Sequence, residues 1–127
     1  EGFVFNRLQG AVLREAYCLV RDGVISPREL DEIMIRGLGK RWSLIGAFGT
    51  SALNVRGGIT AHAARMGASY QRMGKERGQD DPWDEDLVAK VAADISKKFS
   101  PEDWEEDVLK RDIALMKLTA LMRELGL

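Results

Sequence analysis

Each of the three prolines in this chain follows a residue whose side chain ends in an oxygen atom: Ser26-Pro27, Asp81-Pro82 and Ser100-Pro101. Proline suits the first position of an α-helix, because the N–H that it lacks would have no partner there, and a preceding Ser or Asp can cap the helix. Glu29 follows Ser26, and Asp103 follows Ser100, at the spacing of a capping box. The three pairs therefore predict three helix starts.

Apolar residues at spacings of three and four predict the other helices. The first should run for about 19 residues (roughly 28 Å) and end at Gly23. A short second helix from Pro27 should end at Gly37-Leu38-Gly39, followed by a turn and a short helix near 48–54. Further helices are expected over about 59–73, from Pro82 to Phe99 and from Pro101 to about Leu125. No stretch alternates as a strand would, so we expect an all-α bundle of about six helices.

The last predicted helix has two apolar stripes instead of one. A broad apolar surface of this kind predicts contacts on two sides, either with the core and a partner subunit or at a central position. We therefore expect a homodimer. The stripes are Trp104, Val108, Leu115, Leu118 and Met122, beside Leu109, Ile113, Met116 and Ala120.

The formal net charge of −1 conceals an uneven distribution. Up to residue 77 the chain has 12 basic and 7 acidic residues, whereas after it there are 7 basic and 13 acidic ones. Ten of the first 12 are Arg, whose planar guanidinium suits carboxylates and phosphates. An anionic ligand or acidic partner surface is one interpretation, and solvated charge on helix faces is the other. No membrane-spanning run or signal peptide is visible, so we expect a cytoplasmic protein.

Residue types argue against catalysis by this chain alone. Cys18 is the single cysteine and His62 the single histidine, so a thiolate metal site, an internal disulfide and a relay of two imidazoles are all excluded. The acidic runs near residues 80–86 and 105–107 fall in predicted first turns of helices, where acids favour the helix dipole, so we expect no metal site. Gly37-Leu38-Gly39 and Gly57-Gly58 follow no strand, so no cofactor-binding residue is predicted.

Two features suggest substrate contacts. Asn6 is a poor helix former in an otherwise apolar helix start, where it should either cap the helix or touch a partner. Arg41 stands between paired glycines and Trp42, as a clamp for a carboxylate or phosphate would. The chain also opens with Glu1 and runs at once into predicted helix, so we expect a piece of a longer protein.

Several motifs of this chain occur together in one known family. They are GFVFNRLQ at 2–9, Arg14-Glu15-Ala16, Asp22-Gly23-Val24-Ile25-Ser26-Pro27, Asp31, Gly37-Leu38-Gly39 and Ile45-Gly46-Ala47-Phe48. Through them the chain resembles the C-terminal domain of NAD-dependent 3-hydroxyacyl-CoA dehydrogenases. Residues 38–42, Leu53-Asn54 and the extra C-terminal helices make it most similar to the L-gulonate 3-dehydrogenase or lambda-crystallin branch.

The resemblance implies that residues 1–127 are one helical substrate-binding and dimerisation domain, with a bundle like that of the 6-phosphogluconate dehydrogenase C-terminal domain. An N-terminal Rossmann domain, absent from this chain, would bind NAD and supply the catalytic His and Glu, so the fragment alone is expected to be inactive. Asn6 matches the family's Asn near the reacting oxygen of the substrate. Arg41 would bind the carboxylate of a small anionic substrate, and neither a nucleic acid nor a membrane would be a partner.

One departure from the family pattern is visible. Where the family usually reads Gly-Pro-Phe-Glu, this chain has Gly46-Ala47-Phe48-Gly49, so any role inferred from that Glu does not carry over. An alternative that needs no missing domain is a free-standing helical interaction module, whose Arg-rich half binds an acidic partner or nucleic acid. Steep salt dependence of nucleic-acid binding would favour that module.

Overall fold

The fold is entirely helical over the residues that the structure, a computed structural model, describes (2–127). No strand occurs among them, which confirms the prediction of an all-α protein with about six helices. The elements in chain order are α1 (Gly2–Arg21), α2 (Pro27–Ile33), the π-helical turn η1 (Met34–Leu38), α3 (Gly39–Asn54), α4 (Gly58–Glu76), α5 (Glu85–Ile95), the 3-10 turn η2 (Pro101–Asp103) and α6 (Trp104–Glu124).

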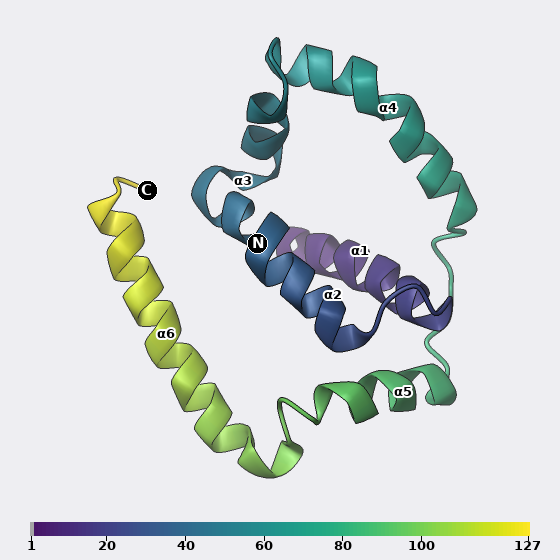
Figure 1. Cartoon of the computed structure of the whole chain (residues 1–127), viewed down its shortest axis with the longest axis vertical. Coiled ribbons are helices and arrows are strands. Elements are labelled where there is room, and N and C mark those ends of the chain that lie inside the picture. The colour runs from purple at the N-terminus through teal and green to yellow at the C-terminus, as the bar shows by residue number, and fades with distance from the viewer. Residues whose placement is uncertain (1) are drawn as a thin grey trace.

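The best-packed part of the chain is where α1, α2 and α5 meet (Figure 1). Cys18 and Val20 of α1 are each 3% exposed, Leu87 of α5 is 8% exposed, and Pro27 of α2 is also buried. We call the second half of α1 together with α2 and α5 the packed sector. In the same view (Figure 1), α3 and α4 leave this sector and return to it at the end of α4, whereas α6 extends alone on the other side. The packed sector therefore holds both ends of the α3–α4 segment, but only the start of the connection to α6.

The first two helix boundaries are as predicted. Gly23 ends α1 with a φ of 73°, a backbone conformation that an L side chain rarely adopts. Its N–H donates to the carbonyl of Val20 (3.0 Å), and the N–H of Val24 donates to that of Leu19 (3.0 Å), which is the Schellman pattern. At the start of α2, the Ser26 hydroxyl accepts from the N–H of Glu29 (3.3 Å).

The predicted helix stop at Gly37-Leu38-Gly39 is wrong. The helix continues through η1 directly into α3, and Gly39 keeps helical angles (φ −60°, ψ −40°). A Cβ on Gly39 would lie 2.5 Å from the carbonyl oxygen of Met34, so this glycine permits the tight backbone of the π-helical turn. The true interruption comes at Gly46, whose φ of 72° kinks α3. A glycine pair alone does not distinguish these two uses.

The prediction that Asp81-Pro82 starts a helix is also wrong. The Asp81 carboxylate is bound by Arg21 (2.7 Å), and Asp84 caps α5 instead by accepting from the N–H of Leu87 (2.8 Å). The third pair starts only a 3-10 turn, in which Ser100 accepts from the N–H of Glu102 (3.4 Å), and α6 follows from Trp104. A long-range ion pair thus overrode the local signal at Asp81.

Candidate functional site

The first half of α1 projects from the packed sector with most of its apolar side chains uncovered. Phe3, Val4, Phe5 and Leu8 are between 62% and 71% exposed, and the Arg7 guanidinium lies 5.4 Å from the centroid of the Phe3 ring. Asn6 is exposed among them and makes no side-chain hydrogen bond with any described residue, so it does not cap α1. The Asn6 amide, which lies in an exposed apolar helix start, is therefore free to form a hydrogen bond with a group outside this chain.

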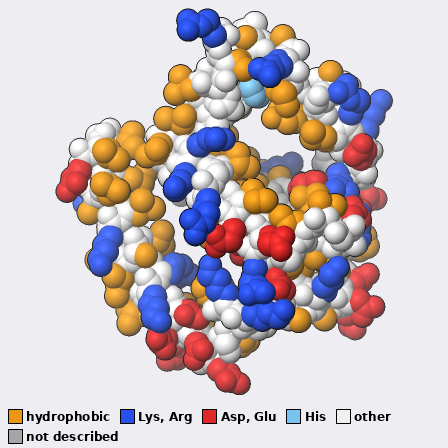
Figure 2. All heavy atoms as spheres, viewed as in Figure 1, with side chains coloured by type: hydrophobic (Ala, Val, Ile, Leu, Met, Phe, Trp, Pro, Cys, Tyr) orange, Lys and Arg blue, Asp and Glu red, His pale blue; other side chains and the backbone are white. Residues whose placement is uncertain are grey.

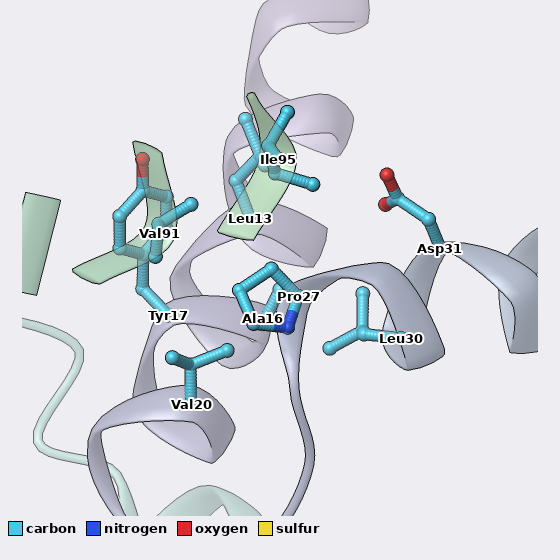
Figure 3. A pocket seen from close by; sticks show the side chains of 9 residues that line it. All are labelled: Leu13, Ala16, Tyr17, Val20, Pro27, Leu30, Asp31, Val91 and Ile95. Atoms are coloured by element: carbon cyan, nitrogen blue, oxygen red, sulfur yellow. The ribbon is translucent and has the colours of Figure 1, made fainter. Parts of the chain in front are cut away.

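An apolar cavity of about 220 Å³ lies between α1, α2 and α5 (Figure 3). We call it the α1–α5 cavity. Asp31 is the one carboxylate among its lining residues, and Figure 3 shows it on the α2 side. Asn6 shares the face of α1 that lines this cavity, two helical turns, or about 10 Å, before Leu13. The lining residues are Leu13, Ala16, Tyr17, Val20, Pro27, Leu30, Asp31, Val91 and Ile95.

A second apolar hollow, of about 480 Å³, lies on a different face of α1, and we call it the α1–α2 groove. Glu15 is the one charged residue along it. Trp42 of α3 is one of its lining residues, and the exposed Arg41 precedes Trp42 in the sequence. The lining residues are Val12, Glu15, Ala16, Leu19, Val24, Ile25, Leu30, Ile33, Met34, Leu38 and Trp42.

The two predicted site residues therefore lie near different hollows. Asn6 extends the face of α1 that lines the α1–α5 cavity, whereas Arg41 stands beside the α1–α2 groove. No hydrogen bond joins either side chain to the other or to another described residue, and Arg41 makes no ion pair within residues 2–127. Both side chains are exposed, so each can still meet a ligand or a second protein surface.

A network of ion pairs ties α1 to the end of α4 and to the connection after it. Arg77 donates to both oxygens of Glu15 (2.9 and 3.1 Å) and to Asp22 (2.9 Å), and Arg21 donates to Asp22 (3.0 Å) and Asp81 (2.7 Å). The bond from Arg21, followed by that from Arg77, holds the pKa of Asp22 below its usual value. Arg21 likewise lowers the pKa of Asp81. Asp22 and Asp81 therefore stay charged near neutral pH.

Beside this network, the rings of Tyr17 and Trp83 stack with centroids 4.0 Å apart and planes 12° apart. Cys18 is buried next to them, and its burial, followed by the nearby Asp81 charge, raises the pKa of its thiol. A raised pKa makes a thiol less reactive near neutral pH. Sequence reasoning missed Trp83 and Arg77, and the only signal for Trp83 was a large aromatic inside a polar connection.

The Arg-rich half is partly neutralised within the chain. Arg28 donates twice to the carboxylate of Asp94 on α5, from its backbone N–H (3.0 Å) and from its guanidinium (3.2 Å), and these contacts lower the pKa of Asp94. Arg36 pairs with Glu32 at 2.6 Å. With Arg21 and Arg77, four arginines of this half already hold carboxylates. Much of the uneven charge thus joins helices of the same chain.

His62 is half-buried on α4, with its ring 6.3 Å from that of Tyr70. Within residues 2–127, no group of three or more His, Cys, Asp or Glu side chains could hold a metal ion. None of the helices in the described part of the chain combines the length and apolar character needed to cross a membrane.

Comparison with known proteins adds a family to this geometry. The model of the 3-hydroxyacyl-CoA dehydrogenase, C-terminal domain, matches residues 2–104. The chain is 33% identical to a 3-hydroxyacyl-CoA dehydrogenase of Gibberella moniliformis and 37% identical to the lambda-crystallin homolog of Rattus norvegicus. It is also 30% identical to an L-carnitine dehydrogenase of Oceanobacillus iheyensis. Each match covers 98% of this chain but only 40% of the relative.

Proposed function

Because this chain belongs to the 3-hydroxyacyl-CoA dehydrogenase family, as its C-terminal domain, we propose that it completes the substrate cleft of an NAD-dependent enzyme that oxidises the 3-hydroxyl of an L-3-hydroxyacid or L-3-hydroxyacyl-CoA. The family match over residues 2–104 carries this proposal. In this enzyme, residues 1–127 act as one helical domain. A domain outside this chain supplies the cofactor site and the catalytic base, so the chain alone is inactive.

The names of the relatives support a substrate class instead of one substrate. One is named for a 3-hydroxyacyl-CoA and another for L-carnitine, and both compounds carry a hydroxyl two carbons away from a carboxyl-derived carbon. The same helical domain therefore occurs in proteins named for thioester and free-acid substrates. L-gulonate, a sugar acid, is the candidate that the lambda-crystallin likeness favours.

The residues of this chain do not fit an NAD site. Dinucleotide sites of the Rossmann type are built at a glycine-rich turn between a strand and a helix. Residues 2–127 contain no strand, and the glycines at 37 and 39 lie inside a continuous helical stretch. The cofactor is accordingly assigned to the part of the relatives that this chain does not match.

Asn6 is the residue of this chain that we assign to the reacting end of the substrate. Its amide can donate a hydrogen bond to the oxygen at C3 without competing for the proton that a base removes. The exposed Phe3 and Phe5 near it offer an apolar surface to the neighbouring domain. When covered, that surface would exclude water from the amide, which strengthens the hydrogen bond.

Arg41 is assigned to an anionic group of the substrate. Its guanidinium is exposed and has no ion-pair partner among the described residues, whereas Arg36, one turn earlier, is already paired with Glu32. The domain is further proposed to pair with a second copy, as the breadth of α6 predicts. Two substrate clefts would then belong to one homodimer.

NAD reduction by the full-length polypeptide that carries this chain tests these assignments, with L-gulonate and an L-3-hydroxyacyl-CoA measured side by side. Asn6→Ala should lower kcat about 100-fold, the usual effect of losing a donor to a developing oxyanion. Gln9→Ala, which removes an exposed amide from the same helix, should leave kcat unchanged. Equal activities for Asn6→Ala and the unaltered enzyme would remove Asn6 from the reacting end.

Arg41→Ala should raise KM for the substrate whose anionic group it binds, by about tenfold. Arg36→Ala, which removes one charge from the same helical stretch, serves as the control. A loss confined to L-gulonate would support the sugar-acid substrate, and a loss confined to the thioester would favour the acyl-CoA. If neither substrate is oxidised and the polypeptide binds nucleic acid with a steep salt dependence, the chain is an interaction module and the dehydrogenase assignment is wrong.

A further inference from the structure

The helix α6 presents two nearly opposite apolar faces, separated by flanks of charged residues. Leu109 and Met116 on one face are 61% and 72% exposed, and Trp104 and Leu115 on the other are 65% and 52% exposed. A helix that is apolar on both faces needs a partner on both. We call Leu109, Ile113, Met116 and Ala120 the outer face of α6, and Trp104, Val108, Leu115, Leu118 and Met122 its inner face.

Among the described residues, only the inner face of α6 contacts its own chain, and it does so only at the start of the helix. Trp104 and Val108 line a hollow together with Phe99 and Pro101 of the preceding connection. The one described element on which α6 packs closely is the adjoining turn η2. Every residue of the outer face is exposed. The outer face therefore has no partner in this chain.

The α1–α2 groove is long enough to accommodate much of the outer face of α6. Its apolar lining continues along α1 through Leu8 and Val4, which precede Val12 at intervals of four residues. From Val4 to Leu19 this strip is about 22 Å long, and α6 is about 31 Å long. Val24 and Ile33 along the groove are 67% and 57% exposed, so they too lack a cover.

Charge favours the same match. The acidic residues Glu105, Glu106 and Asp107 fill the first turn of α6, and Figure 2 shows acidic side chains gathered at that end. The exposed Lys40 lies on α3, two residues before Trp42, which lines the groove. The acidic start of α6 can therefore lie near this lysine while the apolar outer face fills the groove.

We propose that the outer face of α6 docks in the α1–α2 groove of a second copy of this chain. Both surfaces are uncovered on one chain yet do not meet each other, so a twofold exchange covers both at once. The inference rests on the homodimer of the proposed function. It adds a named contact, made by a helix outside the family match of residues 2–104.

Cross-linking between two tagged versions of the full-length polypeptide tests the docking. One version carries Met116→Cys and the other Ile33→Cys, and a short thiol cross-linker should yield a product with both tags. Lys117→Cys, on a charged flank next to Met116, should give at least fivefold less product with the same partner. The native Cys18 is 3% exposed and adds little background.

Equal yields from Met116→Cys and Lys117→Cys, or no product with both tags, would overturn the docking. A cross-link that forms within one chain carrying both cysteines, and does not depend on concentration, would show that α6 folds onto its own groove. That result would also overturn it.

A charge on the outer face gives a second, independent test by sedimentation. Met116→Glu should weaken self-association at least tenfold with helix content unchanged, whereas Lys117→Glu should not weaken it. A Met116→Glu protein that stays fully dimeric would place the dimer contact elsewhere and end this inference, with the dehydrogenase assignment intact. If the unaltered full-length protein does not reduce NAD with either substrate, the proposed function is wrong, whatever the cross-linking shows.

Discussion

The packed sector and α6 have similar sequence patterns but differ in how far their apolar side chains are buried. Each has apolar residues at helical spacing and a helix start near an acidic or hydroxyl side chain. In the packed sector, Val20 and Leu87 are 3% and 8% exposed, whereas Leu109 and Met116 of α6 remain 61% and 72% exposed. The spacing of apolar residues thus decides which face of a helix is apolar, whereas a partner surface within reach decides whether that face is buried.

The largest expected effect is the loss of core packing in the packed sector. Leu87→Ala should lower the free energy of unfolding of the chain by about 2 to 3 kcal/mol, because a buried leucine leaves a cavity. Ile113→Ala on α6, where the side chain is 45% exposed, should have almost no effect in dilute solution. Urea unfolding at low and high protein concentration measures both.

At high concentration Ile113→Ala should become destabilising, because only a dimer would cover that side chain. If it is as destabilising as Leu87→Ala at every concentration, then α6 is packed within its own chain. The contrast between the two regions would then be wrong.

The two tryptophans on either side of α5 allow a second test. Trp83→Ala removes the stack on Tyr17 and should cost about 1 to 2 kcal/mol, whereas Trp104→Ala, at a side chain 65% exposed, should cost less than about 0.5 kcal/mol. Thermal unfolding followed by circular dichroism gives both values. Equal losses would mean that the start of α6 is as well packed as the connection before α5.

Local signals were sufficient where the structure is local. The end of α1 at Gly23 and the cap of α2 at Ser26 depend on atoms within a few residues, so the sequence predicted both. The predicted start at Asp81 failed because Arg21, 60 residues earlier, takes its carboxylate. The residue spacing along one helix does not show which side chain from a distant part of the sequence will form an ion pair with it.

The candidate site divides in the same way. Residue type and the family likeness singled out Asn6 and Arg41, and both are exposed, as ligand-binding residues must be before a ligand or domain covers them. Their separation onto different hollows depends on how α2 and α3 pack beside α1, and the π-helical turn changes that register. No periodicity of single residues predicts a π-helical turn.

Two glycines at equivalent helix ends offer a third comparison. Gly23 after α1 (φ 73°) and Gly126 after α6 (φ 75°) end their helices with the same pair of backbone hydrogen bonds. Gly23→Ala should lower the free energy of unfolding by about 1 kcal/mol, because alanine is strained in this conformation. Gly126→Ala should only fray the end of α6. Urea unfolding reports the first effect, and NMR amide exchange at residues 121–127 reports the second.

If Gly126→Ala lowers the free energy of unfolding as much as Gly23→Ala does, then the end of α6 is part of the cooperative core. The packed sector would have to be extended to include it.

The smallest expected effect is the response to acid. Arginine contacts hold the pKa values of Asp22, Asp81 and Asp94 below their unfolded values, so the stability that they contribute is complete above about pH 4 and is lost as the pH falls through their folded pKa values. On α6, Lys110 lowers the pKa of Glu106 only within one exposed helix turn.

Amide hydrogen exchange at pH 3 compared with pH 6, corrected for intrinsic rates, should therefore show lost protection in the packed sector beyond any change in α6. An Arg21→Gln variant should reduce this difference, because Asp81 then loses its arginine partner and Asp22 keeps only Arg77. Equal losses of protection in both regions would contradict this origin of the acid response.

The stack of Tyr17 on Trp83 and the bond between Arg28 and Asp94 join parts of the chain about 66 residues apart, which affects the order in which the protein forms during synthesis. At ribosomal rates of about 5 to 20 residues per second, α1 and α2 leave the ribosome roughly 3 to 13 s before α5 can cover them. During that interval their apolar sides are uncovered in the nascent chain. The helix that completes the core is thus made well after the helices that it covers, and translation speed through residues 60–95 becomes a determinant of folding yield.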